Sequence, residues 1–263
     1  MPGELALEAS LTAAVTLSRW YRVREKTSQE RDASWEMRFV MFAFLSSGIV
    51  GAVLVLVAHV SRVNDVTRFP KIVTNQVLNM FLGMLEYAPT LAMVPLALLL
   101  LRRTGQSRTD LGVGSPSWKD DIVPAIGLAG AAFGGAIVLA IPFAGLISQH
   151  SGLITKVSVQ GFPRYYLVEA IFMSAVTAVS EEVLVNAYFI TRLEQLGWSS
   201  RGALFVSLAF RTSYHIYYGI GFIFTIPLGY FVTRSFQKHR RLNRAIWAHF
   251  LYDATLFTIS MLH

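Results

Sequence analysis

The residues best suited to chemistry in this sequence are ionisable side chains inside strongly apolar segments. Seven of them fall in the second half of the chain: Glu169, Glu181, Glu182, Arg211, His215, His249 and Asp253. Burying an ionisable group in such a segment is costly, and groups retained there commonly serve a function. Carboxylates and imidazoles together can activate water for hydrolysis, relay protons or bind a metal ion.

Helical spacing groups these side chains on three faces. Arg211 and His215 are four residues apart, as are His249 and Asp253, so each pair shares one face of a helix. Glu181 and Glu182 are consecutive and therefore lie about 100° apart on an α-helix. We expect at most one of these two glutamates to point squarely into a shared site.

Composition indicates that a membrane positions these residues. The chain has 263 residues, of which 54% are hydrophobic and 15% charged, with a mean hydropathy of +0.49. Soluble domains carry about 25% charged residues, and about 20 apolar residues suffice for a helix to cross a bilayer. We predict an all-α, polytopic membrane helix bundle of seven transmembrane helices, or eight if an amphipathic N-terminal helix enters the bilayer. The predicted spans are 39–60, 77–101, 122–147, 165–190, 203–218, 219–233 and 245–262.

The predicted spans divide the chain into three parts. Residues 1–38 form a cytoplasmic tail or an amphipathic interfacial helix, 39–121 a transmembrane pair with a linker, and 122–263 the bundle that carries the candidate site. Within this bundle, the predicted spans 203–218 and 219–233 form either a tight hairpin or one broken helix.

The distribution of basic residues orients the chain. With the N-terminus inside, 17 of the 23 lysines and arginines lie in inner segments, five lie in outer loops and Arg211 lies within a span. Basic residues accumulate in cytoplasmic loops, so this count predicts a multi-pass protein of the plasma membrane with a cytoplasmic N-terminus. The net charge of +7 is spread over separate loops, which suits anionic lipid headgroups and gives no sign of a nucleic-acid partner.

Three short motifs resemble those of a known family. Glu181-Glu182-Val183-Leu184-Val185-Asn186, Arg211-Thr212-Ser213-Tyr214-His215 and His249-Phe250-Leu251-Tyr252-Asp253 follow one another on successive predicted helices. Their order and spacing resemble the EExxxR, FxxxH and HxxxN or HxxxD motifs of the CAAX prenyl endopeptidase and bacteriocin-processing (CPBP, or Abi) family of glutamate intramembrane proteases. The likeness covers about 165–258, and the stretch 211–219 is similar to the actinobacterial branch.

The resemblance implies a hydrolase without a covalent intermediate and without a cofactor. By analogy, Glu181 would be the general base that activates water, with His215 helping to hold that water. His249 and Asp253 would stand where the family stabilises the oxyanion. An ionised Asp cannot donate a hydrogen bond, so Asp253 would have to be protonated or would instead orient His249.

Other catalytic classes find less support in the sequence. Glu, His and Asp are suitable ligands for Zn²⁺, but neither an HExxH nor an HxxEH pattern is present, so we expect no metal site. The absence of cysteine excludes thiol nucleophiles. Ser180 and Ser213 lie near the motifs, but the sequence contains no GxSxG nucleophile elbow.

Two positions depart from the family pattern. Asn186 replaces the arginine of the first motif and Arg211 replaces the phenylalanine of the second. An unpaired arginine inside a span is hard to tolerate, so we expect Arg211 to supply the missing charge by pairing with Glu182. Glu182, Arg211 and Asn186 would then support the site, and Tyr214 and Tyr217, which flank His215, are candidates for contacting substrate.

The sequence therefore favours an intramembrane endopeptidase acting on a peptide or membrane protein, prenylated or not. One alternative is a non-catalytic member of the same family, such as a bacteriocin-immunity or scaffold protein, which the departures at Asn186 and Arg211 favour. Another is a proton-coupled transporter, which would also use buried carboxylates and imidazoles. Such transporters commonly contain inverted repeats, and no internal repeat is visible here.

Overall fold

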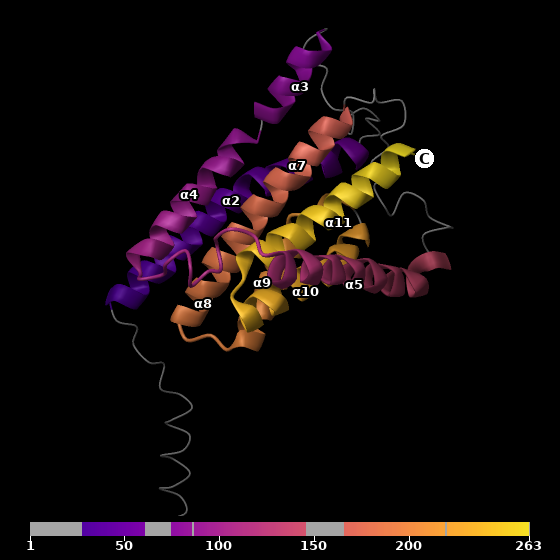
Figure 1. Cartoon of the computed structure of the whole chain (residues 1–263). Helices are drawn as coiled ribbons and strands as arrows, with labels where there is room; N and C mark the ends of the chain where they lie inside the picture. The colour runs from indigo at the N-terminus through magenta and orange to yellow at the C-terminus, as the bar shows by residue number, and fades with distance from the viewer. Residues whose placement is uncertain (1–27, 61–74, 86, 146–165, 219, 263) are drawn as a thin grey trace, which may run out of the picture.

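The computed structural model describes residues 28–60, 75–85, 87–145, 166–218 and 220–262 (Figure 1). All regular secondary structure in these ranges is helical, which confirms the all-α prediction. The predicted span 39–60 lies in α2, Ser28–Val60. Because α2 already begins at Ser28, residues 28–38 are helical and continuous with the predicted span, so the boundary at 38 divides one helix. Residues 1–27 lie outside the described part of the chain.

The predicted span 77–101 consists of two helices. They are α3, Gln76–Leu85, and α4, Ala88–Arg103. Pro89 occupies the first turn of α4, where its missing amide hydrogen costs nothing, whereas in a continuous helix it would remove a backbone hydrogen bond. The break between α3 and α4 therefore follows from a local feature of the sequence.

The most apolar helix runs through the predicted span 122–147. It consists of η1, Trp118–Ile122, α5, Val123–Ala140, and η2, Ile141–Phe143. Within the described ranges, Trp118–Phe143 is the one helix whose length of 26 residues and apolar composition suffice to cross a membrane. The prediction of seven spans is therefore supported at a single span and otherwise stays a prediction.

The C-terminal helices carry the candidate site. They are α7, Tyr166–Glu181; η4, Glu182–Ile190; α8, Thr191–Gln195; α9, Ser200–Ser213; η5, Ile216–Tyr218; η6, Ile220–Thr225; α10, Ile226–His239; and α11, Leu242–Leu262. Helices α7, η4 and α8 follow one another without interruption. Helices α9 and α10 pack against each other, so the predicted spans 203–218 and 219–233 form a hairpin.

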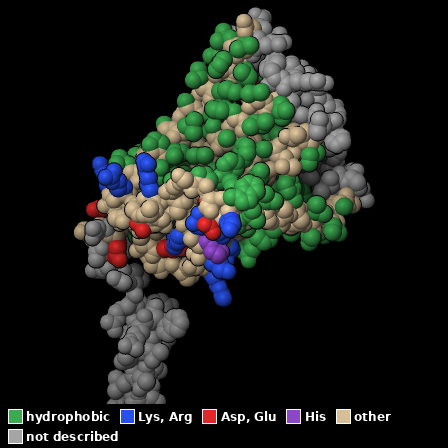
Figure 2. Space-filling model, viewed as in Figure 1, with side chains coloured by type: hydrophobic (Ala, Val, Ile, Leu, Met, Phe, Trp, Pro, Cys, Tyr) green, Lys and Arg blue, Asp and Glu red, His purple; other side chains and the backbone are tan. Residues whose placement is uncertain are grey.

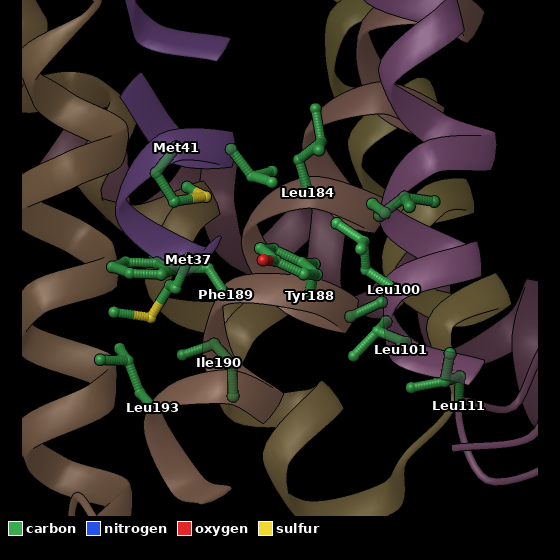
Figure 3. Packing of buried hydrophobic residues seen from close by; sticks show 14 of the residues in the cluster. Met37, Met41, Leu100, Leu101, Leu111, Leu184, Tyr188, Phe189, Ile190 and Leu193 are labelled. Carbon is green, nitrogen blue, oxygen red and sulfur yellow. The ribbon is translucent and has the colours of Figure 1, made fainter. Parts of the chain in front are cut away.

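Two buried clusters hold the helices together. In the first, Tyr188 and Phe189 of η4 lie among side chains of α2 and α4, including Met37, Leu100 and Leu101 (Figure 3). In the second, the small side chains of α5 and α11, such as Ala129 and Ala248, pack with Leu228 and Val232 of α10. Small residues let helices approach closely, which is a common means of association within membranes.

The described surface is largely apolar away from one end of the molecule (Figure 2). Phe39, Phe42, Phe81, Ile141 and Phe205 all expose more than half of their surface. Apolar exposure on this scale is unusual for a soluble monomer and suits contact with lipid. Charged side chains gather instead near the end where α4 finishes and α8 and α10 end (Figures 1 and 2).

Ion pairs connect the chain segments at this charged end. Arg192 of α8 pairs with Glu36 of α2, and Arg240 pairs with Glu194. The side chain of Arg241 donates two hydrogen bonds to Asp121, from Nε to Oδ1 at 2.8 Å and from Nη2 to Oδ2 at 2.9 Å. These hydrogen bonds raise the pKa of Arg241. Residues from the predicted inner segments therefore meet at one end, although the orientation of that end in a membrane stays a prediction.

One glycine is required where the 104–117 linker meets the junction of α10 and α11. Gly112 has a φ of +64°, and a Cβ placed there would lie 2.2 Å from the carbonyl oxygen of Arg240. Beside it, the backbone N–H of Leu242 donates to the carbonyl oxygen of Leu111 at 2.9 Å. Only a residue without a side chain allows this approach of two backbones.

Candidate active site

Glu181 and Glu182 lie where an α-helix passes into a π-helix. Glu181 is the last residue of α7 and Glu182 the first of η4. Both reach the same atom: Nη1 of Arg211 lies 3.1 Å from Oε2 of Glu181 and 2.9 Å from Oε1 of Glu182. Both glutamates therefore contact Arg211, and the expectation that at most one of them points squarely into a shared site stays a prediction. Glutamate side chains are long, so two carboxylates attached about 100° apart on a helix can still converge on one guanidinium.

Glu182 is the hub that joins four helices. It is fully buried, and its Oε1 accepts hydrogen bonds from Nη1 of Arg211 and, at 2.7 Å, from Nδ1 of His249. Its Oε2 accepts a hydrogen bond from Nδ2 of Asn186, whose Oδ1 in turn accepts one from Oγ1 of Thr233 at 2.8 Å. Both oxygens of Glu182 are thus engaged, in keeping with a supporting role.

Glu181 uses only one of its two carboxylate oxygens in hydrogen bonds within the described ranges. Its Oε2 accepts hydrogen bonds from Nη1 of Arg211 and, at 2.6 Å, from the hydroxyl of Tyr214. No side chain within the described ranges donates to its Oε1, and the residue is 7% exposed, whereas Glu182 is 0% exposed. Of the two carboxylates, Glu181 is the one that has an oxygen available for a water molecule.

His249 lies between two carboxylates. Its Nδ1 faces Glu182, and its Nε2 lies 3.3 Å from Oδ2 of Asp253, four residues further along α11. The predicted shared face of His249 and Asp253 is thus present. In this arrangement the Asp253 carboxylate is placed to orient the imidazole, which was one of the two roles considered for it.

His215 joins the cluster through its neighbours on the chain. Its Nδ1 lies 2.9 Å from the carbonyl oxygen of Arg211, and its ring packs on those of Tyr214 at 4.6 Å and Tyr218 at 5.7 Å. It lies at the half-buried edge of the cluster. The side chain of Tyr217 lies outside the described part of the chain, so its predicted contact with substrate has no counterpart here.

The expected pairing of Arg211 with Glu182 is present and is shared with Glu181. Arg211 is 2% exposed, and Gly229 on α10 leaves room for it: a Cβ on Gly229 would lie 2.9 Å from Cδ of Arg211 and 3.0 Å from Cδ2 of Leu208. Arg211 on α9 thus supplies the positive charge that the first motif lacks at Asn186. Gly229 leaves the space that the Arg211 side chain occupies.

Replacing Gly229 with alanine is expected to lower the free energy of unfolding by about 1–3 kcal/mol, because Arg211 and Leu208 must shift to admit the methyl group. Thermal unfolding in detergent measures this loss. Gly130→Ala on α5 is the matched control, since a Cβ there meets no atom within 4 Å. Equal stability of the two variants would contradict the close packing of Arg211 on α10.

Two members of the network have roles that the motifs did not assign to them. Thr233 occupies the last position of a predicted span, where a polar residue is unremarkable in sequence, yet it is buried and bonded to Asn186. Tyr214, predicted as a substrate contact, donates a hydrogen bond from its hydroxyl to Glu181. In the sequence, only the position of Tyr214 next to His215 in the second motif pointed to the site.

The described residues do not form a recognisable metal site. Within them, no group of three or more His, Asp or Glu side chains is placed to hold a metal ion. The arrangement instead offers a buried carboxylate with an available oxygen, a guanidinium that bridges two glutamates, and an imidazole between carboxylates. These groups can together polarise a water molecule and stabilise a developing charge.

The fold and the cluster define a membrane-type helical bundle with ionisable side chains at its centre. Comparison with known families identifies a related class of protein. Residues 163–255 match the family described as type II CAAX prenyl endopeptidase Rce1-like, so this segment of the chain is similar to that family. The matched residues contain all three motifs, so the resemblance seen in the sequence is confirmed. Searches among curated proteins and among solved structures found no match.

Proposed function

We propose that this protein is an intramembrane endopeptidase that hydrolyses a peptide bond with a water molecule activated by Glu181. The family-level assignment supports a CAAX-type protease acting on a membrane-associated peptide. The proposal extends this to a catalytic role for Glu181, His215, His249 and Asp253. We further propose a multi-pass arrangement of seven spans in the plasma membrane, with a cytoplasmic N-terminus.

The observation that carries the proposal is the asymmetry between the two glutamates. Glu182 uses both oxygens within the network, whereas Glu181 engages only Oε2 and leaves Oε1 for a ligand. A general base must lie within hydrogen-bond reach of the proton that it abstracts. A held carboxylate with one available oxygen at the edge of a buried network meets that requirement.

In the proposed reaction, Glu181 accepts a proton from water while the water oxygen forms a bond to the carbonyl carbon of the substrate. The carbonyl π electrons move to oxygen, and the Nε2–H of His249 turns from Asp253, 3.3 Å away, to donate to that oxyanion. Collapse of this intermediate breaks the carbon–nitrogen bond, and the proton held by Glu181 passes to the leaving amine. Asp253 orients His249, and His215 helps to hold the water.

A second candidate function follows from the same ion pairs. Arg211 bridges Glu181 and Glu182, and polar contacts of this kind can serve only to hold membrane helices together. A non-catalytic family member with a scaffold or immunity role would use the network in this way. The departures from the family motifs at Asn186 and Arg211 favour this non-catalytic candidate.

Cleavage of a quenched library of membrane-inserted peptides by the purified full chain in liposomes tests the proposal. We expect hydrolysis that persists in excess EDTA or 1,10-phenanthroline, because the proposed base is a carboxylate that needs no metal to activate water. Loss of cleavage on chelation, with recovery on adding Zn²⁺, would contradict the proposed mechanism. Absence of cleavage across the library would favour the non-catalytic candidate.

A further inference from the structure

Tyr214 makes a buried hydrogen bond to the proposed base. The residue is the C-cap of α9, and its hydroxyl lies 2.6 Å from Oε2 of Glu181. It is 8% exposed, so water competes little for this hydrogen bond. A short hydrogen bond from a hydroxyl to a carboxylate is among the stronger polar contacts in proteins.

The same carboxylate oxygen is held a second time. Nη1 of Arg211 donates to Oε2 of Glu181 at 3.1 Å, so two donors three residues apart on α9 converge on one oxygen. Rotation of the carboxylate would break both hydrogen bonds. The two donors therefore determine where the other oxygen, Oε1, is presented.

The ring of Tyr214 is itself confined by aromatic neighbours. Phe44 and Phe210 contact it in edge arrangements, with ring centroids 5.8 Å and 6.1 Å away, and His215 packs on it at 4.6 Å. Edge contacts of this kind favour a defined ring orientation. Phe44 belongs to α2, so a helix outside the matched residues 163–255 helps to orient this ring.

We propose that Tyr214 is a positioning residue for hydrolysis. Its hydroxyl holds the Glu181 carboxylate in place, and its ring packs against the ring of His215. This inference rests on the proposed function of Glu181. This role differs from the expected contact of Tyr214 with substrate. It also gives α2 a part in the site, because Phe44 keeps the ring of Tyr214 in place.

Tyr214→Phe tests the proposal because it removes the hydroxyl and keeps the ring. We expect kcat to fall by about ten- to a hundred-fold with KM unchanged, as befits loss of a hydrogen bond to a charged group. Tyr188→Phe is the matched control: it removes a hydroxyl that donates to Glu36 at 2.9 Å near the charged end. We expect Tyr188→Phe to lower the melting temperature without lowering kcat.

Two kinetic outcomes would overturn the positioning role. A raised KM with unchanged kcat would assign Tyr214 to substrate binding. An equal fall of kcat in Tyr214→Phe and Tyr188→Phe would indicate a structural role only. If the role is correct, adding Tyr214→Phe to Glu181→Gln lowers kcat no further, because the two residues act as one unit.

Infrared spectroscopy tests the same inference without relying on activity. The carboxylate stretching band that disappears in Glu181→Gln is expected to shift in Tyr214→Phe and to stay in place in Tyr188→Phe. An unmoved band in Tyr214→Phe overturns the inference. If the wild-type chain cleaves no peptide, the proposed function fails, and the infrared shift still decides whether Tyr214 holds the Glu181 carboxylate.

Discussion

Replacing Glu181 with glutamine is expected to lower the rate of peptide hydrolysis by about 10²- to 10⁴-fold, the usual contribution of a general base. The amide has nearly the shape of the carboxylate and can still accept a hydrogen bond from Tyr214 through its oxygen. It cannot take a proton from water. The initial rate of cleavage of a quenched peptide in liposomes measures the loss, and thermal unfolding of the same sample reports whether the variant is folded.

Two further substitutions make this result interpretable. Glu169→Gln changes another buried glutamate of α7, outside the Arg211 network, and should leave the rate within a few-fold of wild type. Glu182→Gln should mainly lower stability, because it weakens the contacts of Arg211, His249 and Asn186 together. A normal rate in Glu181→Gln, combined with a lost rate in a stable Glu182→Gln, would move the base to Glu182.

Replacing Arg211 with phenylalanine, the residue that the family pattern has at this position, is expected to lower the free energy of unfolding by about 3–5 kcal/mol. The substitution removes the cation that bridges Glu181 and Glu182 and leaves two buried carboxylates side by side. Removing one partner from a buried ion pair is costly because the remaining charge has lost both water and its counter-charge. Thermal or denaturant unfolding in detergent measures the change.

Restoring a cation at position 186 tests whether the two departures from the family pattern compensate for each other. Asn186 lies beside Glu182 and is fully buried, so an arginine there can reach the same carboxylate. We expect Arg211→Phe with Asn186→Arg to be more stable than Arg211→Phe alone. Asn186→Arg alone should be less stable than wild type, because it adds a second buried cation. A double variant less stable than Arg211→Phe alone would show that the compensation hypothesis is wrong.

Much of the local structure could be predicted from periodicity and spacing. Each predicted span is helical over most of its described residues, with turns at Tyr87, Tyr214 and His215. The four-residue spacing placed His249 and Asp253 on one face. The break before Pro89 follows from the chemistry of proline, although the hydropathy of 77–101 hid it. These features depend on neighbours along the chain, so the residues that decide them are adjacent in sequence.

The geometry at the glutamates could not be predicted in the same way. The angle of about 100° between consecutive residues of an α-helix separated Glu181 from Glu182, whereas both carboxylates reach Arg211 where α7 passes into η4. A π-helix is rare and occurs mostly within α-helices, frequently at functional sites. The nine residues of η4 are all buried, so surrounding helices govern this segment.

The sequence by itself determined the set of ionisable residues in apolar segments, the order of their motifs and the need for a partner to Arg211. Those conclusions rest on composition, spacing and the high cost of an unpaired charge in an apolar environment. The pairing itself, with Arg211 on both glutamates, Tyr214 on Glu181 and His249 between Glu182 and Asp253, required the tertiary structure. Hydrogen bonds and ion pairs depend on distances between atoms in space, and helix packing brings together residues that lie 29 to 67 positions apart in the chain.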